Sequence, residues 1–437
     1  LHLSLRRQRQ MCIRDRCCRW RKTMTTVIPA PDANNEWRLS TPGSAGWERS
    51  PRPEATNKYF MVSTDGHAQE PKDLWVTRMD DKYQERLPGV IIGMRGEKFQ
   101  KTEGFRNPLK LNNIKFEGQD LLRNKAGYTP EERLADLAAD GTDAEIIFPN
   151  KGLTMWATSD PYFSHAMCQA YNDWAWETFG PHNDQLIPMA CIAPAALDEA
   201  IAEIQRCAEL GFKGLQLPSK PIWGAPDHEA LNYNLREFDP LWAAISEVDL
   251  PATFHISTGR DPRTSRSRGG AVINYAVHSL AQNIEPIANL CASGVAEQFP
   301  NLRFGSVEAG IGWVPWAIQA MDEAYLKHHW AVRPKLELLP SEYFKRQGFA
   351  TFQEDAAGLD LALSHGLVSN FMWANDYPHH EGSWPHSAEA IERTMGELDD
   401  LSRAKILGLN AAEVFKIPIP ERYLGYEDAK ATAGNIS

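Results

Sequence analysis

Long apolar runs and paired cysteines are both missing from this sequence of 437 residues. No run approaches the roughly 18 apolar residues that a membrane-spanning helix needs, and no charged-then-apolar start with a small-residue cleavage site is present. These absences argue against a membrane protein and a secreted one, so we expect a cytoplasmic protein. The seven cysteines show no CxxC spacing and support neither a structural zinc ribbon nor a disulfide framework: Cys12, Cys17, Cys18, Cys168, Cys191, Cys207 and Cys291.

Residues 1–23 differ from the rest of the chain in charge. They carry eight Lys or Arg against one Asp, so the formal net charge of −11 becomes −18 without them. The segment Met11–Arg16 (MCIRDR) resembles a translated sequencing-library adaptor, and we expect a non-native segment with the natural start at Met24. The alternative is a basic arm that binds nucleic acid. The acidic remainder disfavours nucleic acid and anionic membranes as partners.

Short β-rich runs alternate with longer helical patterns after residue 58, which is typical of parallel βα units. The helical patterns include Pro130–Asp140, Asp198–Leu210 and Asn283–Phe299, and Gly211 is expected to end the second of these. Eight such units predict an α/β fold, a (β/α)8 TIM barrel. The expected strands, of which the seventh has the weakest pattern, are Tyr59–Thr64, Ala144–Pro149, Leu186–Ala193, Phe212–Leu217, Ala252–Ser257, Leu302–Val307, Phe349–Phe352 and Phe371–Ala374.

The spacing of these units predicts the domain organisation. Residues 24–58 form an N-terminal extension, residues 59–416 the barrel, and residues 417–437 a peripheral C-terminal tail. Too many residues separate the first strand from the next helix for a simple loop, so we expect an inserted lid or subdomain over 65–128.

Polar side chains stand at the ends of three of the expected strands. Asp65 and His67 end the first strand, His255 lies near the end of the fifth, and Asp376 follows the eighth. Taken singly, each has another explanation, such as a helix-capping Asp or a hydrogen-bonded core His. Together, at one rim of a barrel, carboxylates and imidazoles predict a catalytic metal site.

Five stretches resemble the amidohydrolase-related family of metal-dependent barrel enzymes, whose members include aminocarboxymuconate-semialdehyde decarboxylase and γ-resorcylate decarboxylase. The resemblance covers about residues 59–416 and implies a metal held by Asp65, His67, His255 and Asp376. It also implies a decarboxylase or hydrolase acting on a small, aromatic or unsaturated carboxylate. The matching stretches are DGHAQEPKDLW (65–75), RLADLAADGTDAEIIFPN (133–150), LNYNLREFDPLWAAISEVDLPATFHISTG (231–259), SVEAGIGWVPW (306–316) and WANDYPHHEGSWP (373–385).

The sequence departs from the family pattern at three places. Several relatives begin with His-x-His or Glu-x-His, whereas this chain has Asp65 and His67, which suit zinc, manganese or iron. Glu308 stands where the decarboxylases often have a His, and a carboxylate cannot donate as an imidazolium does. Lys213 lies at the start of the fourth strand, so the bridging lysine of binuclear amidohydrolases is not evident. We expect one divalent metal, zinc first.

Catalytic and substrate-binding roles follow from these positions. Asp376 is expected to be a ligand and proton carrier, and Glu308 or His379 to serve the second proton transfer. His379 and His380 are equally compatible with a second metal or with a plain surface loop. Arg260, in an arginine-rich loop, is the candidate for the substrate carboxylate, although such loops are often only solvated. Trp313 is a candidate aromatic contact, although core packing explains tryptophans as well.

Three functions from different classes remain open. The first is a mononuclear decarboxylase or hydrolase acting on a small molecule. The second is a non-haem iron or mixed-metal oxygenase that uses Glu308 and His379 or His380 as extra ligands. The third is a non-catalytic barrel subunit of a hetero-oligomer. A homodimer is the commonest outcome for a soluble enzyme and is expected here.

Overall fold

The computed structural model describes residues 59–105, 107–111, 118–223, 231–259, 265 and 267–421. The expected segments 1–23 and 24–58 lie outside the described residues, as do Arg260 and most of the expected tail.

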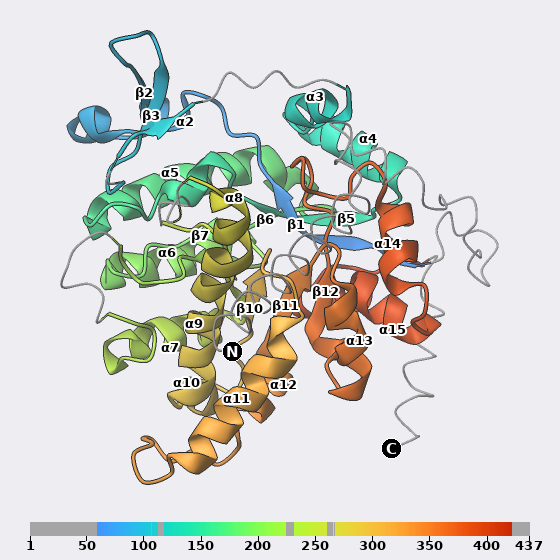
Figure 1. Cartoon of the computed structure of the whole chain (residues 1–437). Helices are drawn as coiled ribbons and strands as arrows, with labels where there is room; N and C mark the ends of the chain where they lie inside the picture. Colours follow the sequence, from blue (N-terminus) through green and yellow to red (C-terminus); the bar gives the residue numbers. More distant parts are fainter. Residues whose placement is uncertain are drawn as a thin grey trace, which may run out of the picture.

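Parallel strands occupy all eight expected positions, and together they form the (β/α)8 barrel (Figure 1). The third strand is divided at Met189 into two pieces that pair with different neighbours. The last strand meets the first through a parallel bridge between Gly66 and Tyr377, where His67 N donates to Tyr377 O at 2.6 Å. The strands, in spatial order, are β1 (Val62–His67), β5 (Ala144–Phe148), β6 (Leu186–Pro188), β7 (Ala190–Cys191), β8 (Leu215–Leu217), β9 (Ala252–His255), β10 (Phe304–Val307), β11 (Gly348–Phe352) and β12 (Phe371–Trp373).

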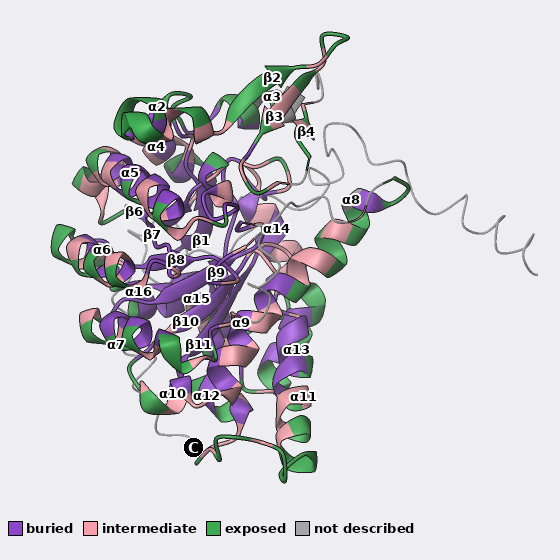
Figure 2. Ribbon diagram, turned by 90° about the vertical axis from the view of Figure 1, so that its left-hand side faces the viewer, coloured by how far each residue is buried: buried purple, intermediate pink, exposed green. Residues whose placement is uncertain are grey.

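Helices cover the outside of these strands. Figure 2 shows the strands buried at the centre, with the outer helices buried where they face the strands and exposed on the far side. The longer ones among the described residues are α4 (Pro130–Asp140), α5 (Pro161–Phe179), α6 (Leu197–Leu210), α7 (Asp239–Val248), α9 (Leu280–Ala292), α11 (Trp313–Lys327), α12 (Pro340–Gln347), α13 (Ala356–Ser364) and α14 (Ser387–Met395). Shorter ones are α8 (Gly270–Ile273), α10 (Val295–Gln298), α15 (Asp400–Ala404) and α16 (Asn410–Phe415).

Local sequence signals explain where several helices begin and end. Thr129 and Glu132 form a capping box at the start of α4, and Pro130 occupies its first turn. Gly211 ends α6 with a φ of 109°, as expected. The expectation of one helix over Asn283–Phe299 was wrong, because Gly294 takes a φ of 94° and separates α9 from α10.

The segment between β1 and α4 has structure of its own. It contains α2 (Leu74–Arg78), a 3₁₀ turn at Asp81–Arg86 and α3 (Gly118–Lys125). It also contains an antiparallel sheet of three strands, β2 (Gly89–Ile92), β3 (Lys98–Lys101) and β4 (Leu109–Lys110). Figure 1 shows β2 and β3 standing away from the barrel strands. In the part of the chain that the structure describes, no helix combines the length and apolarity that crossing a membrane requires.

Candidate metal centre

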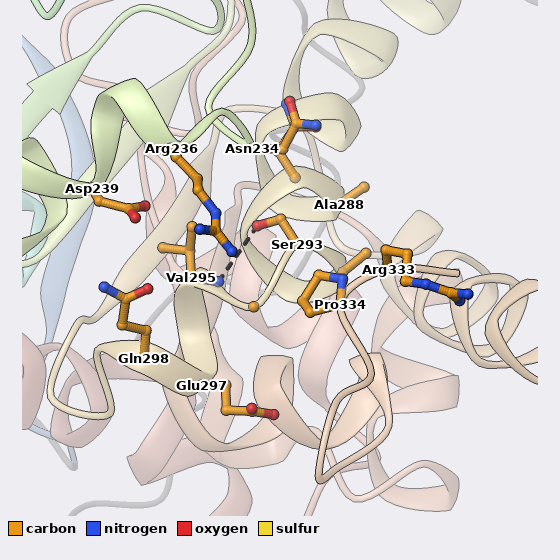
Figure 3. A pocket seen from close by; sticks show the side chains of 13 residues that line it. Asn234, Arg236, Asp239, Ala288, Ser293, Val295, Glu297, Gln298, Arg333 and Pro334 are labelled. Carbon is orange, nitrogen blue, oxygen red and sulfur yellow. Dashed lines mark hydrogen bonds between the residues drawn. The ribbon is translucent and has the colours of Figure 1, made fainter. Parts of the chain in front are cut away.

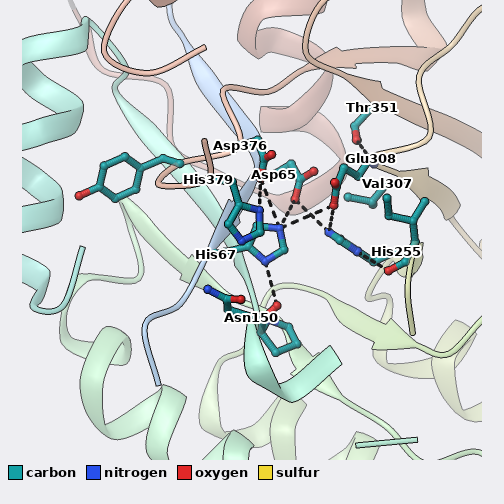
Figure 4. Close-up of polar contacts among 12 residues, drawn as sticks. Asp65, His67, Asn150, His255, Val307, Glu308, Thr351, Asp376 and His379 are labelled. Carbon is teal, nitrogen blue, oxygen red and sulfur yellow. Dashed lines mark hydrogen bonds and ion pairs between the residues drawn. The ribbon is translucent and has the colours of Figure 1, made fainter. Parts of the chain in front are cut away.

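Strand ends bring the chemically active side chains together. Asp65 and His67 lie in β1, His255 is the last residue of β9, Glu308 directly follows β10, and Asp376 follows β12. Parallel strands of a barrel all end at one rim, so residues far apart in the sequence meet there (Figure 4). The four expected ligands, Asp65, His67, His255 and Asp376, are all fully buried.

The distances define a compact cluster. His67 Nε2 lies 3.6 Å from Asp65 Oδ1, 3.4 Å from Asp376 Oδ1 and 3.8 Å from Glu308 Oε2. His255 Nε2 lies 3.3 Å from Asp65 Oδ1 and 3.0 Å from Glu308 Oε2. Ligand atoms of Asp65, His67, His255 and Glu308 thus lie within 4.8 Å of one another, whereas Asp376 belongs to two neighbouring groups that share His67 or Glu308 with the first.

Both imidazoles are oriented by their other ring nitrogen. His67 Nδ1 lies 2.9 Å from the carbonyl oxygen of Pro149, and His255 Nδ1 lies 2.8 Å from that of Ile256. A carbonyl can only accept, so each Nδ1 carries the proton and each Nε2 of a neutral ring presents its lone pair to the cluster. This is the tautomer that a metal-binding histidine needs.

Several buried atoms of the cluster have no hydrogen-bond partner among the described residues. They are the Nε2 atoms of His67 and His255 and both carboxylate oxygens of Asp65 and Asp376. Leaving such groups unsatisfied in a protein interior is costly, and a bound cation satisfies imidazole and carboxylate together. These donors fit a divalent metal ion.

The electrostatics of the cluster point the same way. Burial raises the pKa of Asp376 well above its ordinary value, and the nearby Glu308 carboxylate adds to this. Burial opposes ionisation of His255, yet the carboxylates of Asp65 and Glu308 raise its pKa well above the usual range. The negative charge of the carboxylates therefore exceeds the positive charge nearby, and this favours protonated side chains. A bound metal ion would supply the same positive charge.

His379 lies over the metal-ligand candidates. Its ring stacks on that of His67 with the centroids 4.0 Å apart, and its Nδ1 lies 3.0 Å from Asp376 Oδ1. Burial lowers its pKa, but the charges of Asp376 and Glu308 prevail and raise it to about 10. His379 is thus placed to exchange a proton with Asp376.

Two of these residues have unusual backbone conformations. Glu308 has a φ of 62° and Asp376 a φ of 52°, in the left-handed region that costs a residue with a side chain about 1–3 kcal/mol. Such conformations persist where the surroundings impose them, and they cluster at functional sites. Glu308 follows directly on β10 and Asp376 lies three residues after β12, and both carboxylates turn into the cluster.

A buried ion pair that the sequence reasoning missed supports this strand end. Arg133 in α4 binds Glu145 in β5, with Nη2 and Oε2 2.7 Å apart and both side chains fully buried. Arg133 Nη1 also donates to the carbonyl oxygen of His67 at 2.8 Å. The sequence held a sign of this pair, because Glu145 lies inside the apolar run AEIIF. A buried acidic residue needs a partner, as the buried His255 does.

A cavity of about 270 Å³ adjoins the cluster. Glu308 lines it together with Tyr275, Phe352 and Gln353. A larger cavity of about 860 Å³ lies between α7, α9 and the turn at Pro334 (Figure 3), and no residue of the cluster lines it. The smaller cavity is therefore the candidate substrate site.

Other predicted site residues lie apart from the cluster. Trp313 is buried in the core, and its indole N–H is donated to the carbonyl of Gly310 at 2.9 Å, so that donor is not available to a substrate. The His380 side chain is 69% exposed and lies 2.7 Å from Glu381. Lys213 directly precedes Gly214 and β8.

The sequence profile of the family described as Amidohydrolase matches residues 112–417, well over half of the chain. The chain belongs to the amidohydrolase family. Among curated proteins, it is similar to γ-resorcylate decarboxylase from Rhizobium sp. (strain MTP-10005), at 23% identity over 321 residues. That match covers 68% of this chain and 95% of the relative. It confirms the expected class, an amidohydrolase-related enzyme with carboxy-lyase relatives.

Solved structures share the amidohydrolase fold. An amidohydrolase from Mycobacterium avium subsp. paratuberculosis K-10 has a TM-score of 0.67 at 19% identity, over 82% of this chain and 99% of that one. Dihydroxybenzoic acid decarboxylase from Polaromonas sp. JS666, solved with bound manganese and the inhibitor 2-nitroresorcinol, has a TM-score of 0.56 at 18% identity. The match covers 99% of that decarboxylase and 83% of this chain. At these identities the likeness confirms the barrel.

Proposed function

We propose that this amidohydrolase is a metal-dependent decarboxylase of a small aromatic carboxylate. The observation that carries the proposal is the set of buried ligand atoms of Asp65, His67, His255 and Asp376, which have no hydrogen-bond partners among the described residues. His67 links them, because it belongs both to the close group with Asp65 and His255 and to the one with Asp376. The decarboxylase activity of the relatives supports the choice of reaction. A shared fold alone would not do so.

Asp65, His67, His255 and Asp376 would hold one divalent cation. When bound, such an ion offsets the negative charge of the site and polarises a substrate oxygen as a Lewis acid. Two carboxylates and two imidazoles suit zinc, which the sequence favours, as well as manganese or iron. The manganese in the Polaromonas decarboxylase supports testing manganese first.

Asp376 is the candidate proton donor in the reaction. Without a bound cation, burial and the charge of Glu308 raise its pKa well above the ordinary value of an Asp. In the proposed step the proton of Asp376 is transferred to the ring carbon that bears the carboxylate. The bond from this carbon to the carboxylate then breaks, its electron pair returns to the ring, and carbon dioxide leaves.

His379 and Glu308 assist the proposed step. His379 Nδ1, 3.0 Å from Asp376 Oδ1, can return a proton to Asp376 after each turnover. The histidines beside Glu308 offset its burial and hold its pKa below the usual range, so it remains ionised and can accept a hydrogen bond from a substrate hydroxyl. Glu308 thus takes an accepting role where the decarboxylase relatives were expected to have a donating imidazole.

The cavity of about 270 Å³ supports a small substrate, with Tyr275 and Phe352 as aromatic contacts. Recognition of the substrate carboxylate by Arg260 stays a prediction, because this residue lies outside the described residues. The homodimer and the cytoplasmic location stay predictions as well.

A product assay tests the proposed function. Manganese-loaded protein would be incubated with γ-resorcylate and other hydroxybenzoates, and the loss of the carboxylate followed by liquid chromatography. We expect turnover of at least one of them. In Asp376→Asn the rate should fall by about 100-fold or more, as expected for the loss of a general acid. Asp360→Asn, an exposed site on α13, is the matched control and should be unaffected. No turnover of any hydroxybenzoate would overturn the proposal.

An oxygenase on the same barrel is the second candidate. The observation that favours it is the additional ligand group of Glu308, Asp376 and Glu381 beside the first one. Oxygen consumption that depends on the substrate, measured with an oxygen electrode on iron-loaded protein, would favour it over decarboxylation. Intact metal binding without any turnover would favour the non-catalytic subunit.

A further inference from the structure

A buried carboxylate lies close in the chain to the candidate metal centre without belonging to it. Glu70 comes three residues after His67, and it is only 1% exposed. It is in none of the close groups of ligand atoms that the described residues form. A carboxylate is costly to bury unless donors surround it, so the position of Glu70 has to be explained by its hydrogen bonds.

The donors to Glu70 are three successive backbone N–H groups just after β5. Glu70 Oε1 accepts from Asn150 N at 2.7 Å and from Gly152 N at 3.0 Å, and Oε2 accepts from Lys151 N at 3.1 Å. Lys151 Nζ also donates to the backbone carbonyl oxygen of Glu70 at 2.8 Å. Hydrogen bonds to an ionised acceptor are stronger than neutral ones. Glu70 therefore fastens the turn after β5 to the segment that follows β1.

One peptide group links Glu70 to His67. The N–H that Glu70 Oε1 binds belongs to Asn150, and the carbonyl of the same peptide group is that of Pro149. This carbonyl oxygen lies 2.9 Å from His67 Nδ1 (Figure 4). A peptide group is planar, so a bond that holds its N–H also fixes the direction of its carbonyl. Glu70 thus sets the position of the acceptor that orients the imidazole of His67.

We propose that Glu70 is a positioning residue for the metal centre: it holds the peptide group between Pro149 and Asn150, whose carbonyl keeps His67 Nε2 turned toward the cluster. This proposal rests on the role of His67 as a metal ligand in the proposed function. Groups that hold a metal-binding histidine typically contribute about 10- to 100-fold to metal affinity. Glu70 would make this contribution without touching the metal or the substrate.

The turn that Glu70 holds also reaches the strand end that carries the second imidazole. The carbonyl oxygen of Leu153 accepts from Gly259 N at 2.9 Å, and Gly259 lies four residues after His255. Within that segment, Thr258 Oγ1 donates to the carbonyl oxygen of His255 at 3.1 Å. Loosening the turn would therefore disturb the surroundings of both imidazoles, the first directly and the second through this contact.

Exchanging the carboxylate for an amide tests this proposal on the full-length chain. Glu70→Gln keeps the size of the side chain, but one acceptor oxygen becomes an NH₂ group that faces backbone N–H groups. We expect manganese affinity, measured by isothermal titration calorimetry, to fall about tenfold or more. At saturating cobalt, we also expect a changed visible absorption spectrum, which reports the geometry of the bound ion.

Asp143→Asn is the matched control. Asp143 is also buried, and its Oδ2 accepts from Met61 N at 2.9 Å, but this contact lies just before β1 and β5 begin, at the end opposite the cluster. It should lose stability in urea unfolding while manganese affinity and the cobalt spectrum stay as in the wild type. A role of Glu70 in stability alone would give the same result in Glu70→Gln.

Gly152→Ala provides a second variant that leaves the carboxylate in place. Its added methyl would lie 2.7 Å from Pro149 Cβ and 3.3 Å from Glu70 Oε1, so the turn must shift away from Glu70. We expect a loss of manganese affinity and a change of the cobalt spectrum in the same direction as in Glu70→Gln. If Glu70→Gln does not fold, Gly152→Ala decides the matter.

The outcomes separate this proposal from the proposed function, because no substrate is used. Unchanged affinity and an unchanged spectrum in these variants, or an equal loss of affinity in Asp143→Asn, would overturn the role of Glu70. A wild type that binds manganese but turns over no hydroxybenzoate would overturn the proposed function alone. A wild type that binds no metal would overturn both.

Discussion

Arg133 donates from Nε and Nη2 to one oxygen of Glu145, at 3.0 and 2.7 Å, and no part of either side chain reaches solvent. The same guanidinium donates to the carbonyl oxygen of His67. The other oxygen of Glu145 lies so close to Gly66 that a Cβ there would be 1.9 Å away. This ion pair therefore fixes the backbone between the two candidate ligands Asp65 and His67.

Arg133→Met is expected to destabilise the protein by about 3–5 kcal/mol, because it leaves the Glu145 carboxylate buried without its partner. Urea unfolding followed by circular dichroism measures this change. The double variant Arg133→Met/Glu145→Met should regain most of the loss, because it removes both charges. A double variant no more stable than the single one would contradict this view of the pair.

The loss of stability in Arg133→Met should also depend on pH. Burial raises the pKa of Glu145 to about 7 even with Arg133 beside it, and removing Arg133 raises it further. Below pH 6 the carboxyl of the variant is neutral and costs little to bury, so the loss should be smaller at pH 5 than at pH 8. An equal loss at both pH values would show that Glu145 does not take up the proton.

Gly66→Ala is expected to weaken metal binding. The added methyl would lie 1.9 Å from Glu145 Oε1 and 2.8 Å from its Cγ, so the strand must move between Asp65 and His67. We expect manganese affinity to fall about tenfold or more, equivalent to about 1.4 kcal/mol. Isothermal titration calorimetry would measure it. Gly89→Ala in the exposed strand β2, where the nearest atom is 3.9 Å away, is the control. Unchanged affinity in Gly66→Ala would contradict the role of this contact.

Asp140 is expected to make stability depend on pH. Burial raises its pKa to about 7, against about 4 in an unfolded chain, although Ser387 and Asn375 donate to it. Between these values the folded state binds more protons than the unfolded state, so stability falls as pH rises, by at most about 1.4 kcal/mol per pH unit. Asp140→Asn removes this contribution.

The stability of Asp140→Asn relative to the wild type should therefore rise between pH 5 and pH 7.5. Urea unfolding at both pH values, with the same metal content, would measure the difference. A relative stability that stays constant or falls over this range would show that the Asp140 pKa is not raised.

The sequence predicted the barrel because its strands are apolar runs buried on both faces. It also predicted that Asp65, His67, His255 and Asp376 gather at one rim, because they interrupt or end those runs; their role as ligands stays a prediction. It offered Glu308 as a ligand only in the oxygenase alternative, because the approach of Glu308 to the cluster depends on a left-handed backbone at one residue. Arg133 and Glu145 were missed because α4 packing onto β5 brings them together, and periodicity does not specify such pairings. The break at Gly294 likewise depends on a single φ angle.

The most direct test of the central claim is carbon dioxide release under argon from a hydroxybenzoate such as γ-resorcylate, comparing metal-stripped with manganese-loaded protein. The account predicts one carbon dioxide for each decarboxylated product, only in the loaded protein, with His255→Ala inactive under the same loading. An equal rate in the stripped protein, or no carbon dioxide from any hydroxybenzoate with the loaded protein, would contradict it.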